Sequence, residues 1–160
     1  MNQNITVSHN SLKVLLTRIL GKRVHFPKRY IGKTLFMEDG KKFQVIRDLK
    51  IDPNQHPDRP VAVFKVRFKF SGLPLAVNKR LSMFPTLFLI AKSGFLEKIW
   101  SVSKDGYFQG IYQWTSEESA TEYPQSFIFK MMTRRSAQGT LSYEIIPDTE
   151  LSQYIINLIK

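Results

Sequence analysis

The sequence contains no cysteine, and this absence removes several kinds of chemistry from the 160-residue chain. Disulfide bonds, thiolate metal sites and cysteine nucleophiles are all excluded. Histidine is scarce as well, because the chain has only His9, His25 and His56, which lack the spacing of a metal site. No glycine-rich phosphate loop occurs, since the glycines stand singly at turns. We therefore expect no metal site and no cofactor.

Long hydrophobic runs are also missing. The stretch TLFLIA at 86–91 is far too short to cross a bilayer, and the start MNQNITVSHNS lacks the charged and apolar regions of a signal peptide. Hydrophobic residues make up 42% of the chain and charged residues 23%, as in ordinary globular proteins, and the length suits one domain. We expect a cytoplasmic protein.

Acidic residues are few compared with basic ones. The chain has 24 Lys and Arg against 13 Asp and Glu, a net charge of +11, and no acid precedes Glu38. Such a charge attracts nucleic acid, anionic membranes or acidic ligands, although it serves solubility equally well. Binding of nucleic acid or an anionic membrane through the basic N-terminal segment is therefore an alternative rather than the main expectation.

The N-terminal region has helical periodicity. The stretch SLKVLLTRILGKR at 11–23 predicts a helix in which Ser11 is the N-cap and Gly21 ends the last turn. Its apolar stripe is Leu12, Leu15, Leu16 and Ile19. The stripe suits either a membrane surface or the body of the domain, and we expect it to pack on the domain.

A turn signal and a proline-rich segment define the domain boundaries. Asp39-Gly40 lies between two β-prone runs and predicts a hairpin over 34–49, which we expect to dock on the rest of the protein because two strands alone are marginally stable. DPNQHPDRP at 52–60 predicts a loop. We therefore divide the chain into an N-terminal helix and hairpin extension at 1–60, a main domain at 61–148 and a C-terminal helix at 149–160.

The main domain begins with a clear strand signal, VAVFKVRFKF at 61–70. Its apolar residues alternate with Lys65, Arg67 and Lys69, so the two sets face opposite sides of a sheet. The elements predicted after it are a helix over 74–84 that Pro85 breaks, strands over 94–103 and 107–114 joined by Asp105-Gly106, a helix started by a capping box of Thr115 and Glu118 and resumed over 127–135 after Pro124, a strand over 141–146 and a helix over 150–159.

The order of these elements is β-α-β-β-α-β, which predicts an α+β fold of the ferredoxin-like kind with an antiparallel sheet. Such a sheet carries helices on one face and needs cover on the other. We expect the aromatic residues of the central strands to lie on that second face. A partner sheet, a ligand or the N-terminal hairpin would then cover it.

The main domain resembles the dimeric α+β barrel superfamily, which includes antibiotic-biosynthesis monooxygenases and haem-degrading monooxygenases. It looks closest to the small monooxygenase-like proteins of the YdhR type over residues 61–148. The matching stretches are VRFKFSG (66–72), NKRLS (78–82), GFLEKIW (94–100), FQGIYQW (108–114), the pair Ala120 and Tyr123, and LSYEII (141–146). The resemblance is one of pattern, and none of these motifs is diagnostic of a reaction.

The resemblance implies a homodimer whose two sheets close into a barrel. It also implies a pocket between sheet and helices in each protomer, where relatives oxidise phenolic or quinol-like substrates, or haem, often without metal or flavin. Haem-degrading relatives use an Asn on the first strand and a Trp and a His on the second helix. Here the first strand has no Asn, Tyr123 stands where the Trp would be, and the histidines lie outside the domain. We therefore do not expect haem degradation.

The residue types left for a site are aromatic and basic. Aromatic side chains suit a flat apolar ligand, and cations suit the oxygen of a phenolate or enolate. The candidate ligand-binding residues are Lys65, Arg67, Arg80, Trp100, Tyr112, Trp114, Tyr123 and Arg134. Each aromatic is expected more often in the core than at a ligand, and the strand cations are expected to be solvated or paired with acids such as Glu97 or Glu144.

Three functions remain open at the level of sequence. The first is a cofactor-independent monooxygenase that binds a small aromatic or apolar ligand. The second is a non-catalytic dimeric ligand-binding or scaffold protein. The third is a binder of nucleic acid or anionic membrane. An RNA-recognition module is disfavoured because its K/R-G-F/Y-G/A-F-V signature is missing from YFQGIYQW.

Overall fold

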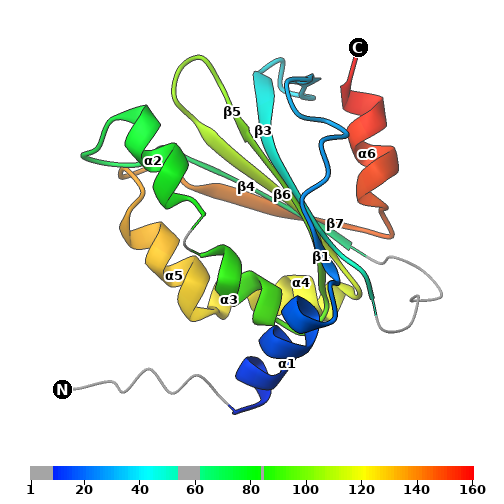
Figure 1. Ribbon diagram of the computed structural model, residues 1–160. Coiled ribbons are helices and arrows are strands. Elements are labelled where there is room, and N and C mark those ends of the chain that lie inside the picture. Colours follow the sequence, from blue (N-terminus) through cyan, green and yellow to red (C-terminus); the bar gives the residue numbers. More distant parts are fainter. Residues whose placement is uncertain (1–8, 54–61, 84) are drawn as a thin grey trace.

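A computed structural model of the chain describes residues 9–53, 62–83 and 85–160. Within them one antiparallel sheet forms the centre of the molecule (Figure 1). Its strands are β1 (Val24–His25), β2 (Thr34–Phe36), β3 (Lys42–Ile51), β4 (Ala62–Phe68), β5 (Phe95–Val102), β6 (Phe108–Trp114) and β7 (Ser142–Pro147). The helices are α1 (His9–Leu20), α2 (Leu75–Leu81), α3 (Thr86–Ala91), α4 (Glu117–Glu122), the 3-10 turn η1 (Tyr123–Gln125), α5 (Phe127–Arg134) and α6 (Leu151–Leu158).

The strand order confirms the ferredoxin-like prediction. Strands β5, β6, β4 and β7 are neighbours in that order, and all of their pairings are antiparallel. The predicted hairpin is present as β2 and β3, and Gly40 takes the positive φ of 79° at its turn. Strand β3 then pairs with β5 and extends the same sheet. The hairpin is therefore docked, as expected, and belongs to the main sheet.

The larger core lies between the sheet and helices α3 to α5 (Figure 1). Strand β4 alternates as its sequence predicts, with Phe64 and Val66 towards the helices and Lys65 towards the far face. The aromatic residues of the central strands also point to the helices, because Trp100, Tyr112 and Trp114 belong to this core. The prediction that placed them on the far face is wrong. In its strand, each of the three side chains points to the same face as the residues that pack against the helices.

The far face is covered by other parts of the same chain. Helix α6 lies across it (Figure 1), and Leu151 and Ile155 join Val63, Ile99 and Ile111 in a second, smaller core. Residues of the β2–β3 hairpin complete that core, which contains Leu35, Met37, Phe43 and Val45. The chain's own helix thus occupies part of the surface that a barrel would give to a partner sheet. The homodimer stays a prediction.

Gln113 holds the start of α6 on the sheet. Its side-chain oxygen accepts a hydrogen bond from the backbone N–H of Leu151 at 2.6 Å. Its side-chain nitrogen donates to the carbonyls of Ala62 at 2.9 Å and Thr149 at 3.3 Å. Because the side chain is buried and its hydrogen bonds are made, it fixes the register of the helix on the far face.

Two predicted helix starts are wrong. Helix α1 begins at His9, so Ser11 lies within it, although the helix does end at Leu20 before Gly21. Helix α4 is capped by Ser116, whose hydroxyl accepts from the N–H of Ser119 at 3.0 Å, and the predicted cap Thr115 precedes this cap in a bend. The backbone N–H of Thr115 bonds to the carbonyl of Gly94, which ties the residue after β6 to the start of β5.

Helix α1 does not pack by its leucines. Leu12, Leu16 and Ile19 are all exposed, against the prediction that this stripe faces the domain, and the side chain of Leu15 lies outside the described residues. Instead, Arg18 donates from one guanidinium nitrogen to the carbonyls of Ile90 at 2.7 Å and Lys92 at 3.0 Å. These carbonyls end α3, where a cation is favoured by the helix dipole. The contact turns the leucines outward.

Two further expectations concern the proline-rich loop and membrane-spanning helices. The proline-rich loop over 52–60 lies mostly outside the described residues. In the described part of the chain, no helix has both the length and the apolar character that a membrane span requires.

Candidate functional site

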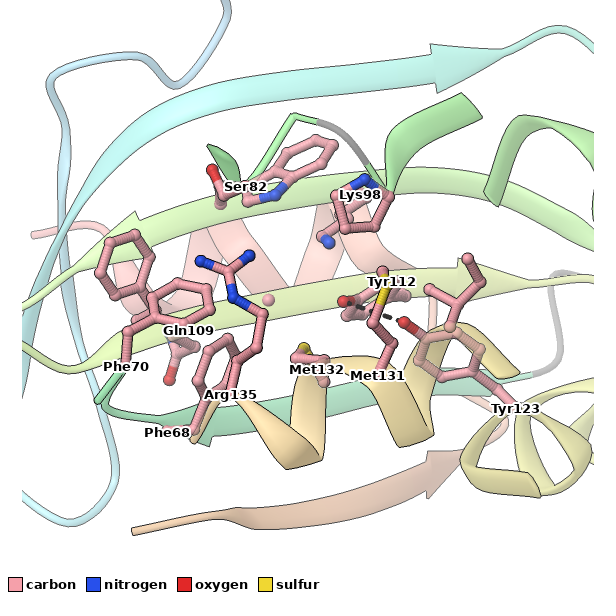
Figure 2. Close-up of a pocket in the computed structure, with 15 residues that line it drawn as sticks. Phe68, Phe70, Ser82, Lys98, Gln109, Tyr112, Tyr123, Met131, Met132 and Arg135 are labelled. Atoms are coloured by element: carbon pink, nitrogen blue, oxygen red, sulfur yellow. Dashed lines mark hydrogen bonds between the residues drawn. The ribbon is translucent and has the colours of Figure 1, made fainter. Parts of the chain in front are cut away.

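A small cavity lies between the sheet and α5, on the helix side. It offers about 40 Å³ to the centres of water-sized molecules, room for about three waters. Its walls are mostly apolar, and they come from β4, β5, β6, the α2–α3 junction and α5 (Figure 2). The residues that decide its chemistry are Lys98, Trp100, Tyr112, Tyr123 and Arg135. Sequence motifs far apart in the chain thus meet in one place.

Lys98 is the unusual member of this set. It projects from the middle of β5 into the helix side, only 6% of the residue is exposed, and its side chain lines the cavity (Figure 2). Its ammonium nitrogen lies 4.2 Å from the ring centre of Trp100 and 4.4 Å from that of Tyr112. Among the described residues, no carboxylate comes within 4.0 Å of it. A buried lysine without an acid partner is rare.

Two influences on the charge of Lys98 oppose each other. Burial lowers the pKa of Lys98 well below its usual value, and the nearby positive charge of Arg47 lowers it further. The two aromatic faces favour the ammonium form instead, by about 2 kcal/mol when desolvated. Full burial shifts a lysine pKa by as much as 3–5 units, which exceeds that stabilisation. The amine of Lys98 is therefore more readily neutral than that of Lys65, whose pKa is raised.

Tyr112 and Tyr123 close the other side of the cavity. Their hydroxyl oxygens lie 3.4 Å apart, and both rings are buried (Figure 2). Burial raises the pKa of each tyrosine, so both are neutral phenols at physiological pH. Gly110 makes this arrangement possible, because a Cβ atom there would lie 2.6 Å from a ring carbon of Tyr112. The ring therefore lies back over its own strand beside Trp100.

Two arginines bring positive charge near the cavity. Arg47 lies over the ring of Trp100 at 5.4 Å and donates to the hydroxyl of Ser82 at 3.2 Å. Arg135 lines the cavity itself, where it stacks over Phe70 at 4.8 Å and donates to the side-chain oxygen of Asn78 at 3.4 Å. The site is therefore cationic at its rim and apolar on its walls.

The structure divides the predicted site residues between the two faces. Trp100, Tyr112 and Tyr123 do line the cavity. Lys65 and Arg67 face the opposite side, in an open depression that also contains Tyr154, so the prediction of one shared pocket is wrong for them. Strand alternation explains the split, since Lys65 and Lys98 lie on opposite faces of the same sheet.

Lys65 and Arg67 are paired with acids, which is one of the two outcomes expected from the sequence. Lys65 lies 2.6 Å from the carboxylate of Glu144 and donates to the hydroxyl of Tyr154 at 3.1 Å. Arg67 is paired with Asp39. Burial alone would lower the pKa of Lys65, but the bonds from Glu144 and Tyr154 outweigh it and raise that pKa. The other acid suggested as a partner, Glu97, pairs with Arg29 instead.

The three remaining predicted residues do not reach the cavity. Arg80 and Arg134 are exposed on the outer surface of α2 and α5, where they line none of the described pockets. Trp114 is fully buried beside Tyr123, with ring centres 5.3 Å apart. Its indole N–H has no hydrogen-bond partner among the described residues. Trp114 is a core residue.

Sequence reasoning missed Lys98, Arg135 and the two methionines beside it. Met131 and Met132 both line the cavity and are only partly buried (Figure 2). The signal for Lys98 was present: in GFLEKIW it follows Glu97 and stands two residues before Trp100, so strand alternation puts Lys98 and Trp100 on one face. The described residues bring no three His, Asp or Glu together in a possible metal site.

Comparisons with known proteins agree with the geometry of the fold. The sequence matches no protein-family model and no curated protein. Among solved structures, a ferredoxin-fold protein from Listeria monocytogenes, described as related to antibiotic biosynthesis monooxygenases, matches with a TM-score of 0.52 at 16% identity. A monooxygenase-like protein from Listeria innocua matches with a TM-score of 0.51 at 14% identity. Each comparison covers 90% of this chain and 90% of the other.

Such low identities are informative about architecture alone. The two matched proteins share the antiparallel sheet with its helices, over nearly the whole chain. The predicted resemblance is thus confirmed in its structural content, and the chain has the ferredoxin-like fold of proteins related to the antibiotic-biosynthesis monooxygenases.

Proposed function

We propose that the protein binds a small planar aromatic molecule with an acidic hydroxyl group in the cavity beside Lys98, and that it acts on this molecule as a cofactor-independent monooxygenase. The observation that carries the proposal is Lys98: a buried amine with a lowered pKa and no acid partner among the described residues. The monooxygenase-like fold supports the reaction class.

The amine has a defined role in such a reaction. A neutral Lys98 accepts the proton of the bound hydroxyl group, which leaves an ammonium ion beside an aromatic oxyanion. The pair attracts strongly because the site excludes most water, and Arg47 and Arg135 add positive charge at the rim. The walls formed by Trp100 and Tyr112 suit a flat ring.

Deprotonation makes the ring electron-rich enough to react with dioxygen. With 1-naphthol as the substrate, carbon 4 of the naphtholate bonds to one oxygen atom, and the resulting peroxide loses water. The balanced outcome is naphthol plus dioxygen giving naphthoquinone plus water, so the substrate supplies all the electrons. Tyr112 and Tyr123 are neutral donors placed near the reacting ring.

The cavity must widen for this function. Ligand pockets usually hold about 300–1,000 Å³, whereas this one admits the centres of water-sized molecules over about 40 Å³. Met131 and Met132 form the movable wall, since they are partly exposed and methionine has three flexible side-chain bonds. The small volume also favours a second function, that of a non-catalytic scaffold with a filled interior.

The test uses 1-naphthol and naphthalene, which differ by one hydroxyl group. Tryptophan fluorescence reports binding because Trp100 lines the cavity. We expect 1-naphthol to bind at least tenfold more tightly than naphthalene, and Lys98→Met to remove this difference. Lys65→Met is the matched control, since it deletes a lysine from the opposite face and should change neither affinity.

Oxygen-18 gas and mass spectrometry then separate the enzyme from the scaffold. The monooxygenase places one labelled atom in the quinone and one in water, in the presence of a chelator, and Lys98→Met loses this activity. Binding without turnover supports a ligand-binding protein instead. Equally weak binding of 1-naphthol and naphthalene, unaffected by Lys98→Met, would contradict the proposed ligand site. The non-catalytic scaffold would then be the remaining function.

A further inference from the structure

Among the described residues, the helix side carries most of the exposed apolar side chains. Ten of the fourteen large hydrophobic residues exposed in that part of the chain belong to α1, α2, α3, α5 or the residue pair just before α2. They are Leu12, Leu16, Ile19, Leu20, Leu73, Leu75, Val77, Leu81, Leu87 and Phe127. We call this set the leucine surface. Concentration of such residues on one side usually marks an interaction site.

The same helices contain no acidic residue. The sequences of α1, α2, α3 and α5 include neither Asp nor Glu, whereas the chain as a whole has 13 acids. Exposed cations lie among the leucines or close to them, and they are Lys13, Lys22, Arg80, Lys130 and Arg134. None of these five has a carboxylate within 4.0 Å in the described part of the chain.

We infer that the leucine surface docks on a lipid bilayer that contains anionic lipids. Apolar side chains flanked by lysine and arginine are what a bilayer surface takes up, with the apolar groups below the headgroups and the cations at their level. Each cation near an anionic surface adds to binding. Helix α1 is the main contact, because Arg18 anchors its inner side to α3 and holds Leu12 and Leu16 outward.

Other occupants fit this surface less well. A second copy docked through the same surface would place cations against cations, since these helices offer no acid for pairing. A nucleic acid would pair with the cations but gives the leucines no apolar environment. An anionic bilayer satisfies both the positive charge and the apolar area of α1, α2, α3 and α5.

The experiment is sedimentation of the protein with vesicles of phosphatidylcholine, alone or mixed with phosphatidylglycerol. We expect binding that requires phosphatidylglycerol and weakens in high salt. Leu16→Ser should weaken binding about tenfold, because the leucine that enters the bilayer is lost. Lys13→Gln should weaken binding about fivefold, because one cation near the anionic surface is lost. The matched controls are Ile156→Ser and Lys104→Gln, whose side chains are equally exposed outside the leucine surface. These controls should leave binding unchanged.

Three results would overturn the inference. The first is no binding to the mixed vesicles, or equal loss in Leu16→Ser and Ile156→Ser. The second is binding to heparin and to vesicles that depends on Lys13 but not on Leu16, which indicates a polyanion binder. The third is a dimer, seen by light scattering, that Leu16→Ser dissociates while vesicles are not bound.

Discussion

Lys65 and Lys98 show what each face of the sheet does to the same side chain. Both project from strands of one sheet, and both are largely buried, at 8% and 6% exposed. Lys65 meets Glu144 and Tyr154, which raise its pKa, whereas Lys98 meets aromatic rings and Arg47 and has its pKa lowered. The far face therefore favours the charged form of its lysine by pairing it with an acid, and the helix side favours the neutral form by burying the amine.

The same contrast extends to other groups of the two faces. On the far face, Asp48 and Glu97 share Arg29, and Asp39 pairs with Arg67. On the helix side, the residues around Phe64 are aromatic, with rings of Tyr112, Tyr123 and Phe129 within 5.9 Å. The ion pairs of the far face tolerate water at their edge, whereas the aromatic rings of the helix side depend on tight packing.

The largest test of this contrast removes a ring from the helix side. Phe64 is fully buried and contacts four other rings, so Phe64→Ala leaves a cavity in the larger core. We expect the free energy of unfolding to fall by about 3–5 kcal/mol, measured by urea denaturation. A loss under about 1 kcal/mol would show that the ring cluster is not the main core.

A second test releases α6 from the far face. Gln113→Leu keeps the size of the side chain but leaves the N–H of Leu151 and the carbonyl of Ala62 without their partner. We expect a loss of about 2 kcal/mol and faster amide exchange in α6, measured by hydrogen–deuterium exchange. Exchange that accelerates equally in α5 would mean global destabilisation rather than release of this helix.

The third test compares the two lysines directly. Lys98→Met removes a buried amine that lacks an acid partner, so we expect it to stabilise the protein at pH 7 by about 1–3 kcal/mol. Lys65→Met breaks pairs with acids that are themselves more than half exposed, and we expect a change of about 0–1 kcal/mol in the opposite direction. Chemical denaturation of both variants measures the sign of each change in the free energy of unfolding.

The pH dependence of Lys98 sharpens this comparison. Since its pKa is lower in the folded chain, the unfolded chain binds more protons between the folded pKa and about 10.4. The stability of the wild type should therefore rise with pH across that window, and the Lys98→Met variant should lack this rise. Lys65, whose pKa is raised, gives the opposite slope above about pH 10.4. Parallel curves for wild type and Lys98→Met would contradict a lowered pKa.

Local signals predicted the elements well. Alternation in VAVFKVRFKF, the Asp39-Gly40 turn and the interruption at Pro124 each correspond to an observed feature, because each depends on neighbouring residues. The cap at Ser116 was missed since Thr115 fits the same pattern one residue earlier. The observed start is set by Ser116, whose hydroxyl accepts the hydrogen bond from the backbone N–H of Ser119.

The site was harder to predict because it depends on which strands become neighbours. Trp100, Tyr112 and Tyr123 were expected in one pocket and do meet, whereas Lys65 and Arg67, expected in the same pocket, lie on the opposite face. The alternation of β4 was known, but the side facing the helices was not. The pairing of Lys98 with Tyr112 across β5 and β6 is a matter of register, which no local pattern contains.

Gly110 determines how easily this interior accommodates change. The ring of Tyr112 fills the space that a Cβ atom would take at this position. The width of the cavity therefore depends on the absence of a side chain at Gly110. Replacement by alanine would force the ring away from its strand and towards Met131 or Tyr123, with no change in charge. The substitution adds a single methyl group, yet it changes the shape of the cavity. It therefore offers a way to adjust the size of ligand that the cavity admits.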